Sequence, residues 1–165
     1  MRKLLSITLL FLSFSIFSQQ ELRFDIADAL ALRSLDITYE YSISEQTSIG
    51  ISALFNFEGR NSDFRYNEDQ MITPFFRHYF STDSNWNFFG ELFFGINTGE
   101  DEVDNNGILT YTDYTDGALG IGIGTKYVSD GGFVIDVHGG LGRNLFGNDS
   151  PILVPRVGVG VGYQF

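Results

Sequence analysis

Charged side chains occupy alternate positions in several apolar segments of this chain, and they are the residues whose types could do chemistry. They are Arg23, Asp25, Asp36, Glu40, Arg77, Glu91, Lys126, Asp136 and Arg156, with His138 in the same pattern. Such groups could pair in a packed polar interior or carry protons or ions along a path. We predict the packed interior, with Arg77 approaching Glu91 and Lys126 lying diagonal to Asp136.

The two histidines are the candidates for a general base. A Ser/His/acid triad needs a hydroxyl within hydrogen-bond reach of the imidazole. His78 is followed by Tyr79 and Phe80, and His138 is flanked by Val137 and Gly139. This pattern assembles no triad, so we expect no catalytic residues, no cofactor and no enzymatic activity.

The acidic segment 98–116 carries a spacing that resembles a calcium-binding loop. Its candidate ligands are Glu102, Asp104, Asn106 and Asp113, with Gly107 at the sixth position. The first ligand is Glu rather than Asp and the twelfth is Asp rather than Glu, so the pattern departs from the usual loop. Acidic surface loops are also often simply hydrated, and both interpretations stay open.

The last thirteen residues, LVPRVGVGVGYQF, alternate almost without a break. Successive side chains of a strand point to opposite faces, so one face is bulky and apolar and the other is nearly bare. A soluble sandwich would place polar groups on the second face. A narrow transmembrane barrel instead turns the apolar face to lipid and small or polar residues to the lumen, where glycines let facing side chains interdigitate.

Eight segments with this period are predicted to be strands, which makes the fold an all-β, eight-stranded antiparallel up-and-down transmembrane barrel. They span 22–27, 34–43, 48–57, 71–80, 86–97, 117–128, 132–142 and 153–165. The segment 28–33 could bend or turn helical, and Pro74 predicts a bulge because proline cannot donate to a ladder.

The connections alternate between short links and long polar ones, as in outer-membrane barrels. The long ones are predicted at 58–70, 98–116 and 143–152. Aromatic residues gather near the short links, as an interfacial girdle would. They are Tyr41, Tyr79, Trp86, Tyr127, Phe133, Tyr163 and Phe165.

The first twenty residues are typical of a secretory signal peptide. Arg2 and Lys3 precede an apolar run, and Ser18 lies before a polar exit, so we predict a signal peptide over 1–20 and a barrel domain over 21–165. Without Arg2 and Lys3, eight of the ten basic residues remain against 21 acids, a net charge of −13. So acidic a surface argues against nucleic acid and anionic lipid head groups as partners. The chain contains no cysteine, which excludes disulfides and thiolate metal sites.

The leader, the eight segments and the ending resemble the small eight-stranded outer-membrane barrels typified by the OmpA membrane domain and OmpX. The resemblance implies that Val161, Tyr163 and Phe165 form the signal read by the barrel-insertion machinery. Thr73–Arg77, Gly142–Phe146 and Pro155–Gly158 are similar to short outer-membrane barrels with no assigned activity. Fold alone does not define function.

These observations predict a monomeric outer-membrane protein in contact with lipid. Its lumen should be packed, and its role should be structural or carried by long loops that meet an unknown surface partner. Two alternatives remain at this level. One is a narrow channel for ions or small solutes, and the other is a secreted, lipocalin-like soluble barrel that turns its bulky face inward around an apolar ligand.

Overall fold

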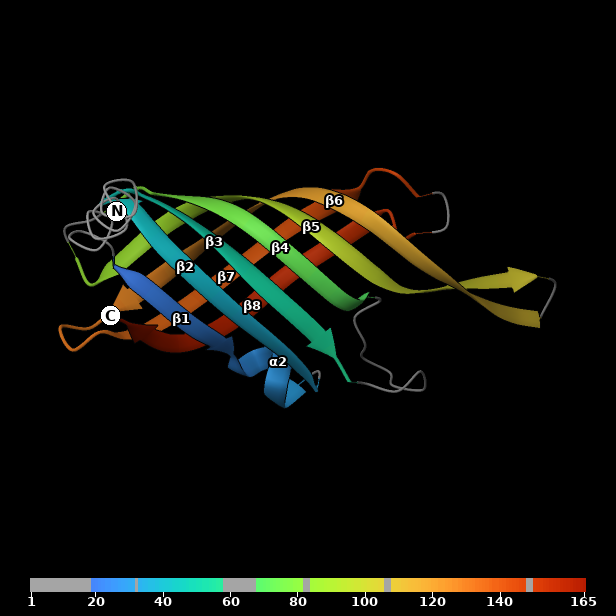
Figure 1. The fold of residues 1–165 in the computed structure, drawn as a ribbon, viewed down its shortest axis with the longest axis horizontal. Coiled ribbons are helices and arrows are strands. Elements are labelled where there is room, and N and C mark those ends of the chain that lie inside the picture. Colours follow the sequence, from blue (N-terminus) through green and yellow to red (C-terminus); the bar gives the residue numbers. More distant parts are fainter. Residues whose placement is uncertain (1–18, 32, 58–67, 82–83, 106–107, 148–149) are drawn as a thin grey trace, which may run out of the picture.

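The chain folds into a closed barrel of eight antiparallel strands in which each strand pairs with its neighbours in sequence and the first pairs with the last (Figure 1). The computed structural model describes residues 19–31, 33–57, 68–81, 84–105, 108–147 and 150–165; side chains are not described at 31 and 102–111. The elements are β1 (Gln20–Asp25), α2 (Ile26–Ala31), β2 (Ser34–Ser44), β3 (Thr47–Asn56), β4 (Glu68–Tyr79), β5 (Trp86–Asn105), β6 (Ile108–Val128), β7 (Phe133–Asn144) and β8 (Leu153–Gln164). The predicted fold class is confirmed. The predicted signal peptide lies outside the described residues except for its last two positions.

The seam between β1 and β8 closes the barrel through the C-terminal residue. Phe165 donates its backbone N–H to the Gln20 carbonyl (2.8 Å), and Gln20 donates back to the Phe165 carbonyl (3.1 Å). The register then runs through Leu22↔Tyr163 and Phe24↔Val161. Closure leaves no open edge along the barrel wall, which is the condition for placing strands in lipid.

The two faces of the sheet are oriented as predicted. Ile121 is 69% exposed on the outer face, whereas Lys126 is 5% exposed and Gly160 is buried on the inner face. The soluble alternative required the bulky residues to turn inward and is therefore wrong. Among the described residues, no helix is long and apolar enough to cross a membrane.

Large aromatic side chains fill the lumen where the opposing inward positions are glycine. A Cβ added at Gly120 would overlap the Phe93 ring, and one at Gly124 would overlap Phe89. Phe75 points inward and occupies the space that Gly50 leaves. The predicted interdigitation across glycines is confirmed. The sequence did not reveal which aromatic side chains fill the space at these glycines. Adjacent phenylalanines lie on opposite faces of the sheet at Phe75 and Phe76, and again at Phe88 and Phe89.

The prediction of a long loop over 98–116 is wrong. The β5–β6 pairing continues from Gly99↔Tyr114 to Asn105↔Ile108, although β4 reaches β5 only as far as Gly99 and β7 reaches β6 only as far as Ala118. The two strands therefore project beyond the barrel as a two-stranded arm (Figure 1). Threonines and tyrosines at 110–115 favour the extended chain despite the acids between them.

The two irregular segments have different outcomes. Residues 26–31 form α2, whose first turn is capped by Asp25 Oδ1 accepting from the Asp28 N–H (3.0 Å), and Arg33 follows at φ 46°. The bulge predicted at Pro74 is wrong. The β3–β4 register runs through Ile51↔Pro74, and the β4–β5 register is unchanged between Ile72↔Ile96 and Phe75↔Phe93. Proline is tolerated because its φ suits a strand and its missing donor leaves only a local interruption of the ladder.

Candidate functional site

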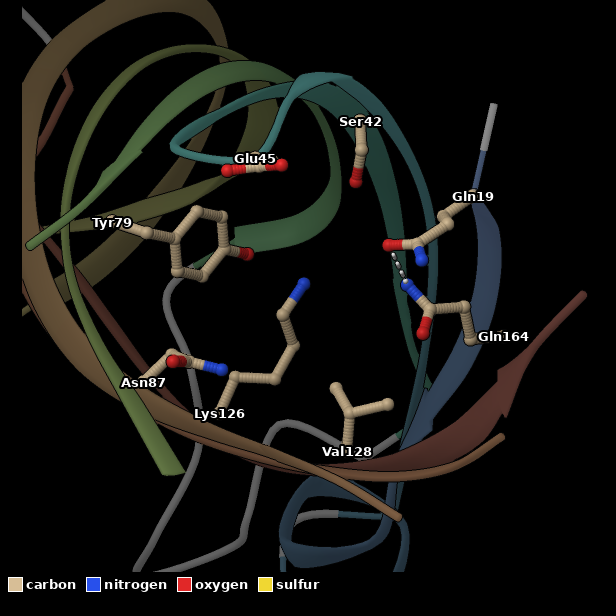
Figure 2. A pocket seen from close by; sticks show the side chains of 8 residues that line it. All are labelled: Gln19, Ser42, Glu45, Tyr79, Asn87, Lys126, Val128 and Gln164. Atoms are coloured by element: carbon tan, nitrogen blue, oxygen red, sulfur yellow. Dashed lines mark hydrogen bonds between the residues drawn. The ribbon is translucent and has the colours of Figure 1, made fainter. Parts of the chain in front are cut away.

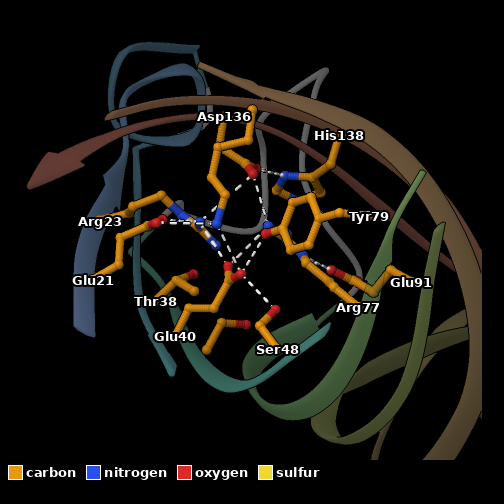
Figure 3. Close-up of polar contacts among 12 residues, drawn as sticks. Glu21, Arg23, Thr38, Glu40, Ser48, Arg77, Tyr79, Glu91, Asp136 and His138 are labelled. Carbon is orange, nitrogen blue, oxygen red and sulfur yellow. Dashed lines mark hydrogen bonds and ion pairs between the residues drawn. The ribbon is translucent and has the colours of Figure 1, made fainter. Parts of the chain in front are cut away.

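The carboxylate of Glu40 on β2 is the centre of the charged lumen (Figure 3). It accepts hydrogen bonds from Arg23 Nη1 at 2.8 Å, Lys126 Nζ at 2.8 Å and Ser48 Oγ at 2.6 Å. Arg77 Nη1 lies 3.1 Å away, and the Tyr79 hydroxyl donates as well. These donors come from β1, β3, β4 and β6, so this one side chain ties together opposite sides of the barrel.

Arg77 on β4 is the most buried cation of the network, with no exposed surface. Its Nε lies 2.6 Å from Glu91 Oε2, which confirms the predicted pair, and its Nη1 lies 2.7 Å from Asp136 Oδ2. The guanidinium also stacks over the Phe89 ring, 4.0 Å from its centroid. A charge held by three carboxylates and an aromatic face is compensated in a low-dielectric interior, where an unpaired charge would be costly.

Lys126 lies directly opposite Asp136 in the β6–β7 register, not diagonal to it as predicted, and its ammonium contacts other carboxylates. Nζ instead binds Glu40 and Glu21 Oε2 (3.0 Å) across the lumen. Asp136 binds Arg77 and His138, whose Nδ1 lies 2.7 Å from Asp136 Oδ1. Glu21 was missed because the first strand was predicted to start at Leu22, whereas β1 begins two residues earlier, at Gln20.

A hollow of about 410 Å³ opens at the end of the barrel that carries the short connections (Figure 2). Lys126 and Tyr79 project into it, and Gln164 donates to Gln19 (3.2 Å) at its rim. The girdle prediction placed Tyr79 at the lipid interface and is wrong for that residue, which is buried in the lumen. Its ring contacts Phe89 edge-on, with the ring centroids 5.5 Å apart.

The lumen carries more acids than bases among the described residues. Arg156 donates from Nη1 to Ser52 Oγ (3.1 Å), and its Nε lies 3.2 Å from Glu91 Oε1. Beside it a cavity of about 20 Å³, room for one water, is lined by Asp36, Glu68 and His138. Acids that line the lumen or are buried against it are Glu21, Asp25, Asp28, Asp36, Glu40, Glu68, Glu91 and Asp136. Among the described residues these eight acids exceed the four bases Arg23, Arg77, Lys126 and Arg156, whereas the charged positions predicted to face the lumen comprised five acids and the same four bases.

At the opposite end from the short connections, Asp116 fixes the segment after β7 to β6. Asp116 lies two residues beyond Ala118, the last β6 residue that pairs with β7, and so at the base of the arm, outside the closed wall of the barrel. Its Oδ1 accepts from the Phe146 N–H (2.9 Å), and its Oδ2 accepts from the Gly147 N–H (2.8 Å) and Ser150 Oγ (2.5 Å). Burial opposes ionisation, but the hydrogen bonds from Ser150, Gly147, Phe146 and Gly117 outweigh it and lower the pKa of Asp116 to about 2.

The remaining candidates lie apart from the lumen. His78 faces outward, with its ring 5.6 Å from that of Phe80. Asn106 and the side chains of Glu102 and Asp104 fall outside the described residues, and Asp113 is exposed opposite Glu100 on the arm. Within the described residues, no three acidic or histidine side chains gather as a metal site would. The calcium spacing therefore stays a prediction.

The comparisons with known proteins concern the fold. No protein-family model and no curated protein matches the chain. Solved structures do match. The N-terminal β-barrel domain of OprF from Pseudomonas aeruginosa is 12% identical, with a TM-score of 0.62, over 90% of this chain and 96% of that one. Ail, the attachment invasion locus protein of Yersinia pestis, is 16% identical (TM-score 0.53; 90% and 95% covered), and Neisserial surface protein A, NspA, is 14% identical (TM-score 0.52; 90% and 94% covered). The chain thus has the fold of the small eight-stranded outer-membrane β-barrels.

Proposed function

We propose that this chain is a monomeric, integral outer-membrane protein with a closed lumen that presents the β5–β6 arm as an interaction surface. The observation that carries the proposal is the arm itself, which continues past the ends of β4 and β7. The outward band of apolar side chains, such as Ile121 and Phe88, supports placement in lipid. Location in the outer membrane is supported by the fold shared with OprF, NspA and Ail.

The central network supports a structural role for the lumen rather than conduction. Arg77, Glu40 and Asp136 cross the barrel interior and are 0–1% exposed. An eight-stranded barrel is just wide enough for side chains to fill it. The purified barrel in planar bilayers should show no steady single-channel conductance, and steady conductance would favour the channel alternative.

The arm has the features of a protein-binding edge. Among the described strands, β4 pairs with β5 up to Gly99 and β7 pairs with β6 up to Ala118, so the arm continues past both neighbours. A strand at the edge of a sheet can accept an added strand from another chain. The segment 98–116 contains Glu100, Asp101, Glu102, Asp104, Asp113 and Asp116 and no Lys or Arg, so a basic partner fits it. Ail carries attachment in its name, and NspA is called a surface protein, which agrees with such a role.

Membrane placement is tested first. The full-length protein should fractionate with outer membranes and migrate differently on a gel before and after boiling. Recovery in the soluble periplasmic extract would contradict the proposal. Removing Phe165, which follows the outward-facing Val161 and Tyr163, should reduce the inserted fraction if these residues are the insertion signal. Unchanged insertion would reject that part.

The arm is tested with probes of defined charge. Cells displaying the protein should bind beads coated with polylysine and not beads coated with heparin. The variant E100Q/D101N/D113N should weaken binding to polylysine, because it removes three exposed or half-exposed acids of the arm. The matched control E45Q/D130N neutralises acids at the other end of the barrel and should bind like the unmodified protein. Equal binding by all three proteins would argue against the arm.

A further inference from the structure

A largely apolar groove of about 620 Å³ crosses the lipid-facing side of β5 to β7, near the short connections. Phe80, which directly follows β4, and Phe88 form one side, and Ile123, Thr125, Val137 and Gly139 form the rest of its outward lining. Both phenylalanines are largely exposed, as is Ile123. Large exposed side chains therefore border a strip of the barrel wall where the outward side chains are small.

The outward-facing Gly139 makes this strip low. It pairs with Ile123, which in turn pairs with Gly90, where an added Cβ would meet the Phe80 ring at 3.2 Å. The lumen glycines are required by packing, since a Cβ at Gly120 or Gly124 would collide with a ring. A Cβ at Gly139 would meet only Val157 Cγ1, at an ordinary 3.7 Å. The barrel can hold a side chain at Gly139, so the space there is not a consequence of its internal packing.

We propose that this groove binds one acyl chain of a phospholipid from the leaflet at the short-connection end. The inference rests on the proposed membrane location, and the groove is continuous with the apolar band that contacts lipid. An acyl chain seated in it is in contact with Phe80 and Phe88 on one side and Val137 on the other, and each CH₂ that is buried there favours binding. The rest of the barrel surface is convex, so a lipid whose acyl chain lies in this groove makes more contacts than a lipid of the surrounding bilayer.

The charges near the groove favour a zwitterionic head group that carries an ammonium. Asp130 is exposed in the connection between β6 and β7, the strands that carry Ile123 and Val137, and Glu45 lies at the same end of the barrel, where it lines the hollow. The bases Lys126 and Arg77 lie in the lumen and are paired with carboxylates. Acidic side chains at this rim attract an ammonium and repel an anionic head group.

The test measures lipid retained by the full-length barrel in detergent. Native mass spectrometry should show one preferred adduct with dioleoylphosphatidylethanolamine and a weaker one with dioleoylphosphatidylglycerol. Gly139→Leu should reduce that adduct roughly tenfold by filling the groove. Ala53→Leu, which also enlarges a lipid-facing position but on β3, should leave it unchanged. Equal adducts in all three proteins would overturn the site, and preference for phosphatidylglycerol would overturn the head-group assignment.

A second readout locates the chain. Trp86 is the only tryptophan and lies two residues before Phe88 on β5, so one equivalent of chain-brominated phosphatidylethanolamine should quench it. Gly139→Leu should remove the quenching, and persistent quenching would contradict the groove. Both variants must keep the gel shift on boiling, which separates loss of the lipid site from loss of the barrel. If Gly139→Leu does not fold, Gly139→Val gives the same comparison with a smaller side chain.

Discussion

In the lumen, Nη1 of Arg77 on β4 lies 3.1 Å from Oε2 of Glu40 on β2, although these two strands are not neighbours. Arg77 simultaneously binds Glu91 on β5 and Asp136 on β7. The pair therefore spans the barrel interior rather than one hairpin. It adds a cross-connection to a wall that backbone pairing holds only between adjacent strands.

Replacing Arg77 with Leu should destabilise the barrel by roughly 3–5 kcal/mol, because three buried carboxylates would lose their shared cation. The free energy can be measured by urea unfolding of the barrel in lipid vesicles. Arg143→Gln, which removes an exposed cation on β7, is the control and should change stability by less than about 0.5 kcal/mol. Similar urea midpoints for the two variants would mean that the network contributes little.

Tyr79→Phe removes one hydroxyl donor from Glu40 and keeps the ring against Phe89. A buried hydrogen bond to a charged group contributes about 1.5–3 kcal/mol, and we expect a loss in this range. Tyr39→Phe is a matched control, because its hydroxyl donates to Gln20 at an exposed site (3.0 Å). The same unfolding measurement compares the two variants. Equal losses of unfolding free energy would mean that the Tyr79 hydroxyl contributes no more to stability than an exposed hydroxyl does.

Alternation predicted the barrel because lipid outside and a crowded lumen inside impose opposite demands on successive residues. The same parity placed Arg23, Glu40, Arg77 and Lys126 in the lumen. It could not say that Lys126 binds Glu21 instead of Asp136. That contact depends on the stagger and curvature of the closed sheet, which bring together residues that are remote in sequence.

Sequence reasoning failed where composition and periodicity disagreed. Acids and asparagines made 98–116 look like a loop, yet β5 and β6 pair with each other as far as Asn105↔Ile108. Tyr79 was assigned to the interface because it is aromatic and near a turn. Its parity, shared with Arg77, would have placed it correctly in the lumen.

Gly120→Ala should destabilise the barrel by about 1–3 kcal/mol, because its Cβ would overlap the Phe93 ring and approach the Gly142 backbone (2.7 Å). Gly139→Ala has only an ordinary contact and should be close to neutral. Adding Phe93→Leu to Gly120→Ala should recover part of the loss by vacating the ring. Equal effects of the two single alanine variants on the urea midpoint would contradict the interdigitated lumen.

Asp116 should hold the segment after β7 down to strongly acidic pH. Its pKa is lowered from 3.8 to about 2, so its stabilising contribution is complete above about pH 4 and is lost as the pH falls through about 2. Hydrogen-exchange protection of the Phe146 and Gly147 amides, both donors to Asp116, reports this directly. Asp116→Asn should lower that protection already at neutral pH, since the amide accepts more weakly than a carboxylate. Asp113→Asn, an exposed acid on the same strand, should leave it unchanged, and loss of protection in the unmodified protein near pH 5 would show that another group controls the segment.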